Sequence, residues 1–163
     1  MTTARRDPAT LPGRPCSLAA ALEVVGDRWA LLAVREVLFG NHQFSQIARN
    51  TGAPRDRLAA RLKDLVAAGV LERRMDRRTA RSRYGEGYFL TPAGRDLGSV
   101  LGTLRTWGER WAVTESPVRM LHHGHPLVTA TVCATCGESV DEHDVARSMA
   151  VPGWTMAGPE AGD

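Results

Sequence analysis

The residues that could do chemistry fall into two groups, and the larger is a dense run of basic side chains. Ten basic and four acidic residues lie between Arg55 and Arg83, a net charge of +6, whereas the whole chain carries +3. Charge concentrated in this way indicates a polyanionic partner, because a guanidinium group pairs with phosphate and can bond two acceptors of guanine at once. A charge run taken alone also fits a solvated surface, which is the plainer alternative.

Helical spacing predicts which of these side chains can face a partner. Leu58, Leu62 and Leu65 recur at the 3.6-residue period, so they define the buried face of a helix. The other faces then present charge, and Arg55 and Arg57 in the first turns are expected to contribute most to sequence choice. The candidate DNA-contacting residues, including those of the basic segment that follows, are Arg55, Asp56, Arg57, Ala60, Arg61, Lys63, Arg74, Arg77, Arg78, Arg81 and Arg83.

The second group consists of three cysteines, which allow metal or redox chemistry. Cys133 and Cys136 are spaced as C-x-x-C and followed by Gly137, a pattern like one knuckle of a zinc ribbon. A complete zinc site needs two more ligands, and the histidines near in sequence are His122, His123, His125 and His143. A hairpin without metal is the favoured interpretation, so no cofactor is predicted, and zinc at the two cysteines is the alternative.

Cys16 stands just before a predicted helix. The positive end of the helix dipole, with Arg14 or Arg28 nearby, would stabilise a reactive thiolate there, so Cys16 is a candidate redox sensor. A small packing residue is the alternative. Trp29, Trp107 and Trp111 could line an apolar pocket for a small aromatic effector, or belong to the core.

No acid, base and nucleophile converge in a recognisable motif, so the sequence does not predict an enzyme. Hydrophobic residues make up 43% of the 163 residues and charged residues 24%, as expected for one folded domain with an appendage. No apolar run is long enough to cross a bilayer and no signal peptide is recognisable, so the cytoplasm is the predicted compartment, without a membrane partner.

The elements that would hold these residues can be read in order along the chain. Spacing and capping residues predict helices over about residues 17–25, 28–39, 44–51 and 54–68. Ser17 and Asp27 are the expected N-caps of the first two helices, and Gly52 the end of the third. Two strands, from Val70 and from Tyr88, follow as a hairpin with a basic loop. This order is the plan of a winged helix.

The C-terminal part divides into a long helix and a small extension. Pro92 opens a helix with a broad apolar face that one domain core cannot cover, which indicates self-association, and folding back over the first two helices is the alternative. Beyond Glu115, the stretch "LVTATVCATCGESV" predicts a strand, a cysteine turn and a second strand. The predicted parts are a flexible arm over 1–15, the DNA-binding and dimerisation domain over 16–112, the extension over 113–152 and a loose tail over 153–163.

In this context the chain strongly resembles the HxlR-type winged-helix transcriptional regulators of bacteria. The resemblance covers about residues 16–111 and rests on Cys16 and on the stretches "ALEVVGDRWALLAVREVLFG", "RLAARLKDLVAAGVLERR" and "YFLTPAGRDL". It implies a homodimer built from the N-terminal and C-terminal helices that binds an inverted-repeat operator. It also implies a sensing cysteine at Cys16, because several relatives use one there. Ala53 and Pro54 depart from the branched residue and serine usual before the recognition helix.

Together these observations predict an α+β, mostly helical fold. Its parts are a winged helix-turn-helix domain, flanking dimerisation helices and a small C-terminal β-hairpin extension. The predicted function is a DNA-binding regulator, in the simplest case a repressor, whose partners are double-stranded DNA and a second copy, with a small-molecule effector as a further candidate. The alternative is a protein-interaction module whose basic winged helix docks an acidic partner and whose tail binds zinc.

Overall fold

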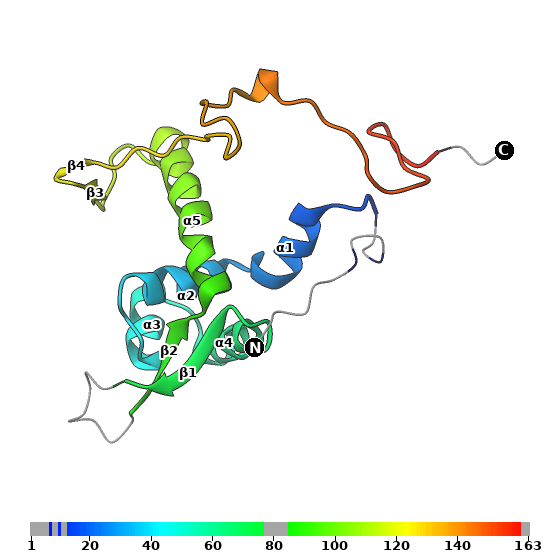
Figure 1. The fold of residues 1–163 in the computed structure, drawn as a ribbon. Coiled ribbons are helices and arrows are strands. Elements are labelled where there is room, and N and C mark those ends of the chain that lie inside the picture. The colour runs from blue at the N-terminus through cyan, green and yellow to red at the C-terminus, as the bar shows by residue number, and fades with distance from the viewer. Residues whose placement is uncertain (1–6, 8–9, 11–12, 77–84, 161–163) are drawn as a thin grey trace. The chain divides into compact units, whose positions relative to one another are not determined.

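A computed structural model describes residues 7, 10, 13–76 and 85–160 (Figure 1). The chain forms two compact units, Met1–Gly98 and Ser99–Asp163, which are described separately below. The predicted domain boundaries after residues 15, 112 and 152 stay predictions.

Helices dominate the first unit, which confirms the predicted α+β, mostly helical class. Its elements are α1 (Ser17–Val25), α2 (Arg28–Leu38), α3 (Phe44–Thr51), α4 (Arg55–Ala67), β1 (Leu71–Met75), β2 (Glu86–Leu90) and the start of α5 (Pro92–Trp111). The strands form an antiparallel pair, which lies beside α4 (Figure 1). This is the predicted order of a winged helix.

Capping residues explain where the helices begin and end. Asp27 caps α2 as predicted, because its Oδ1 accepts hydrogen bonds from the backbone N–H of Trp29 at 2.8 Å and of Ala30 at 3.3 Å. Gly52 ends α3 at φ +68°, a left-handed conformation that glycine adopts without strain. The predicted N-cap at Ser17 is wrong. Cys16 takes that place, since its extended backbone presents a carbonyl that accepts the first helical bond, from Ala20 N–H.

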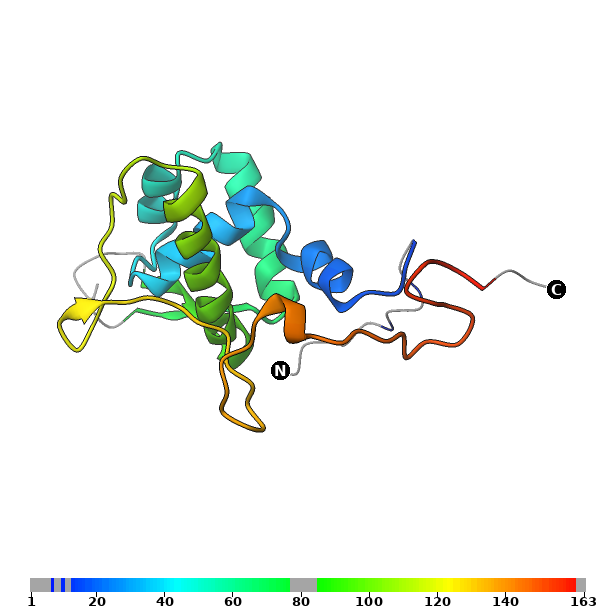
Figure 2. The ribbon, with the colours of Figure 1, turned by 90° about the horizontal axis from the view of Figure 1, so that it is seen from above.

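The core of the first unit is built where α2, α3 and α4 meet. Ile47, Leu58, Leu62 and Leu65 have no exposed surface, and α4 packs on α2 (Figure 2). Burying each such side chain contributes about 1.5–3 kcal/mol. The three leucines predicted to face inward therefore do so, which orients the rest of α4.

A buried carboxylate joins the helices beside this core. Glu36 on α2 accepts hydrogen bonds from Arg35 Nη2 at 2.7 Å, from Asn41 Nδ2 at 2.8 Å and from Asn50 Nδ2 at 2.9 Å. Burial alone would raise the pKa of this carboxyl, but the donors, with Asn50 first, outweigh burial and lower the pKa from its ordinary value of 4.5. Glu36 thus ties α2 to the following turn and to α3.

The hairpin is joined to the helices by a third, short stretch of chain. Tyr88 N–H donates to the carbonyl of His42 at 2.9 Å, so the segment before α3 pairs with β2. The strand β2 begins at Glu86, two residues earlier than predicted, because Glu86 and Gly87 pair with Met75 and Arg74. The strand β2 therefore has a hydrogen-bonded neighbour on each edge, β1 on one side and the segment at His42 on the other.

The start of α5 is anchored to the turn between α4 and β1. Thr91 Oγ1 donates to the carbonyl of Gly69 at 2.6 Å and to that of Val70 at 3.1 Å. A Cβ atom on Gly94 would lie 2.2 Å from the carbonyl oxygen of Val70, so only glycine permits this approach. Both contacts involve residues of the first unit.

The second unit contains the rest of α5, two short strands and a 3₁₀ turn. The strands are β3 (Leu121–His122) and β4 (His125–Pro126), joined by a two-residue turn in which His123 and Gly124 have φ of 49° and 84°. The 3₁₀ turn, η3, spans Glu142–Asp144.

The regular strands predicted on either side of the cysteine turn are not found in the described residues. One bridge, between Val132 and Ser139, is found there. The segment before this bridge is engaged by α5 instead of by a partner strand. Arg105 Nη2 donates to the carbonyl of Leu127 at 3.2 Å, and Thr106 and Thr129 share a hydrogen bond of 3.0 Å between their hydroxyls.

Across the described part of the chain, none of the helices combines the length and the apolar character that crossing a membrane requires.

Candidate nucleic-acid interface

The outer surface of α4 carries the candidate interface, which includes the basic side chains of Arg57 and Lys63. Both are exposed, and neither has an ion-pair partner among the described residues. Ala60 is exposed beside them, and its small side chain allows a partner to approach the helix closely. Asp56 is exposed as well. The helix follows α3 after a short turn in which Ala53 is buried, the arrangement of a helix-turn-helix.

Arg55 opens α4 and is exposed, but it is not free. Its guanidinium carbon lies 4.9 Å from the centre of the Phe44 ring at the start of α3, within the range of a cation–π contact. This contact places the charge at the junction of the two helices. Arg55 and Arg57 are therefore both accessible, as a DNA-contacting role requires.

Arg61 lies differently from the other basic residues of α4. Its Nη1 forms an ion pair of 3.2 Å with Asp64, and the side chain is 39% exposed. It lines a hollow of about 340 Å³ together with Glu23 and Val24 of α1. Arg61 thus lies near α1. Its predicted contact with DNA stays a prediction.

The arginines of β1 are held by neighbours on the hairpin. The guanidinium carbon of Arg74 lies 3.7 Å from the centre of the Phe89 ring, and its Nε lies 3.3 Å from a carboxylate oxygen of Glu72. Arg73, which was not among the predicted contacts, pairs with Glu86 at 2.7 Å. The basic side chains of the described hairpin are therefore positioned by stacking and pairing, unlike Arg57 and Lys63.

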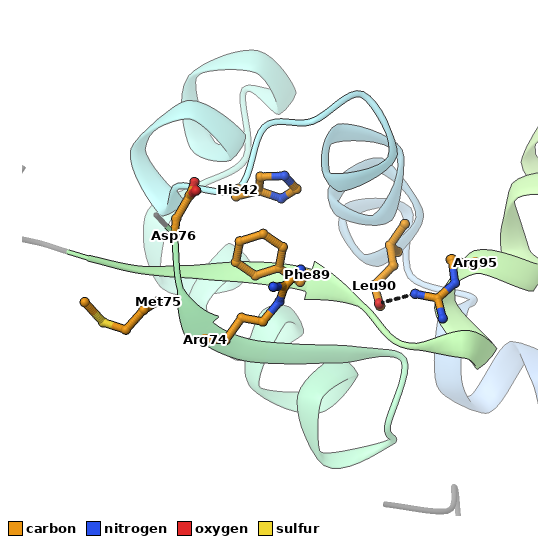
Figure 3. A pocket seen from close by; sticks show the side chains of 7 residues that line it. All are labelled: His42, Arg74, Met75, Asp76, Phe89, Leu90 and Arg95. Carbon is orange, nitrogen blue, oxygen red and sulfur yellow. Dashed lines mark hydrogen bonds between the residues drawn. The ribbon is translucent and has the colours of Figure 1, made fainter. Parts of the chain in front are cut away.

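An open hollow of about 440 Å³ lies at the base of the hairpin (Figure 3). The ring of His42 stacks on Phe89 with a centroid distance of 4.2 Å, and Arg74 reaches the same ring from the neighbouring strand. Arg95 completes the basic lining, with its Nη1 donating to the carbonyl of Leu90 at 3.0 Å. The sequence contained no signal for His42 and Arg95 here, because the hollow joins three separate segments of chain.

The comparison with known families supports one of the two functional alternatives. A family model described as HxlR-like helix-turn-helix matches residues 24–116, more than half of the chain. The chain belongs to this HxlR-like family.

The relatives to which this HxlR-like protein is similar carry names of the same kind. It is 38% identical over 133 residues to the HTH-type transcriptional regulator Rv3095 of Mycobacterium tuberculosis, covering 79% of this chain and 82% of the relative. It is 32% identical over 93 residues to the HTH-type regulator YvaP of Bacillus subtilis, covering 56% of this chain and 82% of the relative. The crystal structure of PA1607 is similar with a TM-score of 0.71 and 34% identity, covering 82% of this chain and 94% of that one.

The HxlR-like chain is therefore a transcriptional regulator of the helix-turn-helix type, and DNA is its partner. These findings confirm the predicted family and leave the individual contact residues as predictions. Four of those residues, Arg77, Arg78, Arg81 and Arg83, lie outside the described residues.

The cysteines of the HxlR-like chain lie in two settings. Cys16 is half-buried at the N-cap of α1, with a free thiol. Hydrogen bonds from the backbone N–H groups of Cys136 and Thr135 lower the pKa of Cys133 to about 7. Cys136 is exposed. Within the described residues, no group of three or more His, Cys, Asp or Glu side chains is arranged to hold a metal ion.

Proposed function

We propose that this regulator is a homodimeric repressor that reads an inverted-repeat operator through the major groove with the first turns of α4. The observation that carries the proposal is the outward exposure of Arg57 and Lys63 on a helix whose leucines are fully buried. Such a helix can enter the groove while its opposite face stays attached to the domain. Repression is the simplest result of a dimer that occupies a promoter.

The arginines near the start of α4 are assigned different roles in this proposal. Arg57 is unpaired among the described residues, so its guanidinium group can bond the two acceptors of a guanine. Arg55 is held against Phe44, which suits a phosphate at a fixed position beside the groove. Arg74 and the four arginines beyond the described part of the hairpin are assigned to phosphate, where counterion release supplies the gain.

An apolar stripe on α5 supports the dimer. Val100, Leu104, Trp107 and Trp111 recur at intervals of four, three and four residues, so they share one side of the helix. Trp107 is 59% exposed and Trp111 is 70% exposed, which is costly for side chains of this size unless a second copy covers them. Two copies related by a two-fold axis would set their α4 helices about 34 Å apart, one turn of DNA.

Cys16 is assigned to the response of the regulator. Its thiol is free and only half-buried at the start of α1, a position where an oxidant or electrophile can reach it. A small aromatic effector is the alternative signal. Either would act by changing how the dimer holds its two α4 helices.

The test uses fluorescence anisotropy with two labelled duplexes of equal length, one from the promoter next to the gene and one with scrambled sequence. The wild-type protein is expected to prefer the promoter duplex and to lose affinity steeply as salt rises. Arg57→Ala should weaken promoter binding by about 1–3 kcal/mol and leave the scrambled duplex nearly unaffected. Arg110→Ala removes an exposed arginine from α5 instead and is the matched control.

Two results would count against the proposal in different ways. An equal loss on both duplexes for Arg57→Ala would remove its base-reading role and leave a phosphate contact. Absence of binding to either duplex, with the dimer intact by sedimentation, would favour the protein-interaction module with an acidic partner.

A further inference from the structure

The open hollow at the base of the hairpin is lined by three separate segments of the first unit (Figure 3). One is the link before α3, the second is the hairpin of β1 and β2, and the third is the first turn of α5. The volume of about 440 Å³ lies in the range of small-molecule sites, roughly 300–1,000 Å³. The hollow is therefore large enough for a small organic molecule, which would contact all three segments.

Two guanidinium groups in the hollow keep N–H donors for such a molecule. Arg95 donates from Nη1 to the carbonyl of Leu90 at 3.0 Å, while its Nε and Nη2 make no hydrogen bond within the described residues. Arg74 is exposed, and its Nε lies 3.3 Å from Glu72, so its two Nη nitrogens stay available. Two adjacent N–H groups of a guanidinium match the two oxygens of a carboxylate. The donors of the hollow therefore suit an organic acid.

The rest of the lining favours a ligand that has an apolar body. The Phe89 ring is held in place by His42, stacked at 4.2 Å, and by the guanidinium group of Arg74, at 3.7 Å. Leu90 and the exposed side chain of Met75 add further apolar surface. An inorganic anion would leave this surface in water, whereas a ring or hydrocarbon body would cover it. The lining therefore favours an organic anion over an inorganic one.

Asp76 also lines the hollow, and its position indicates how the ligand is oriented. Its side chain is buried and is not free. Figure 3 shows Asp76 and Arg95 at opposite ends of the hollow. Because like charges repel, the carboxylate of a ligand is expected at the Arg95 end, with its apolar body directed toward Phe89.

We propose that this hollow binds a small aromatic carboxylate, which pairs with Arg95 and Arg74 and packs its ring against Phe89. The inference deepens the proposed function, because it gives the effector a site and rests on the phosphate contact assigned to Arg74. A bound carboxylate neutralises the charge of Arg74, so DNA binding releases fewer counterions and becomes weaker. This effect acts on Arg74 directly and adds to any change in how the dimer holds its α4 helices. By reciprocity, DNA weakens ligand binding by the same factor.

The binding test is isothermal titration calorimetry of the full-length protein without DNA, with cinnamate as the probe and the neutral cinnamamide as its matched control. Wild type is expected to bind cinnamate about tenfold more tightly than cinnamamide, because hydrogen bonds to a charged group are the stronger ones. Arg95→Met removes the guanidinium group, keeps an apolar stem and should weaken cinnamate binding about tenfold. Arg110→Met makes the same change at an exposed position outside the hollow and should leave binding unchanged.

Four calorimetric results would contradict the inference. They are absence of cinnamate binding to wild type, equal affinity for cinnamate and cinnamamide, undiminished binding by Arg95→Met, and displacement of cinnamate by an equal concentration of inorganic phosphate. The last result would identify a simple anion site. Circular dichroism and urea unfolding show whether Arg95→Met is folded, and Arg74→Met, which leaves the bond between Arg95 and Leu90 in place, provides a second variant with the same expected loss.

The effect on DNA is measured separately, by anisotropy with the promoter duplex. Saturating cinnamate should weaken promoter binding by wild type about fivefold and should leave binding by Arg95→Met unchanged. Because the calorimetry contains no DNA, cinnamate binding without any promoter binding would contradict the proposed function and leave the ligand site standing. Promoter binding that cinnamate does not alter would contradict the inference and leave the proposed function standing.

Discussion

In the unit Met1–Gly98, Ile47, Leu58 and Leu62 are fully buried, whereas every residue from 99 to 160 remains at least partly exposed. The first unit can therefore be stabilised by its own core, since each buried side chain contributes about 1.5–3 kcal/mol. The second unit instead presents Trp107 and Trp111 to the outside. The contrast teaches that the helix carrying the candidate DNA contacts is supported by internal packing, whereas the C-terminal part leaves large apolar side chains uncovered.

The strongest test of this contrast compares a core substitution with an exposed one. Leu62→Ala removes a fully buried side chain and should lower the free energy of unfolding by about 2–5 kcal/mol. Val128→Ala, at a position 76% exposed, should change it by less than about 0.5 kcal/mol. Urea denaturation followed by circular dichroism measures both. Equal losses would mean that the second unit has a core of its own.

Substitution of the buried carboxylate Glu36 should cause the next largest loss of folding stability. Glu36→Ala leaves its three donor side chains without their acceptor and should cost about 3 kcal/mol of stability at neutral pH. The exposed Glu72, which pairs with Arg74, is the matched control, and Glu72→Ala should cost less than about 1 kcal/mol.

The contribution of Glu36 should also depend on pH. Because the folded-state pKa lies below the ordinary 4.5, the contribution is present above that value and is lost as pH falls through the folded pKa. Unfolding measured between neutral and acidic pH should therefore show a smaller decline for Glu36→Gln than for wild type. An identical decline in the two proteins would show that Glu36 does not contribute to acid unfolding.

A third test concerns the exposed stripe of α5. Trp107→Ala should weaken the proposed dimer by about 2 kcal/mol, because large aromatic side chains often dominate interfaces. Arg110 lies off the stripe, so Arg110→Ala should leave the dimer unchanged. Sedimentation equilibrium measures the dimer dissociation constant. If Trp107→Ala left the dimer dissociation constant unchanged, the stripe would not be the surface that a second copy covers.

The smallest expected effect distinguishes two arginines on the same helix. Arg61 is engaged with Asp64 at 3.2 Å, whereas Arg57 has no ion-pair partner among the described residues. Arg61→Ala should therefore weaken promoter binding by less than about 0.5 kcal/mol, below the loss expected for Arg57→Ala. Anisotropy with the promoter duplex measures the difference. A larger loss for Arg61→Ala would mean that its ion pair opens when DNA binds.

Local signals in the sequence were sufficient for much of the first unit. Asp27, Gly52 and the leucines of α4 were predicted in the positions that the structure confirms. Each acts within one or two turns of chain, through a cap, a left-handed φ or a helical period. Of the two errors, one was local and the other was not. The cap at Ser17 was displaced by one residue, and the strands near the cysteine turn were replaced by contacts with α5.

The sequence by itself determined the order of the elements, the buried face of α4 and the concentration of positive charge along it. Only the tertiary structure decided which side chains are held by distant partners, because those contacts depend on neighbours from separate segments. Asn50 reaches Glu36 from another helix, and His42 meets Phe89 across 47 residues of chain. Helical period and capping follow from covalent neighbours, whereas these contacts follow from how α2, α3 and the hairpin pack together.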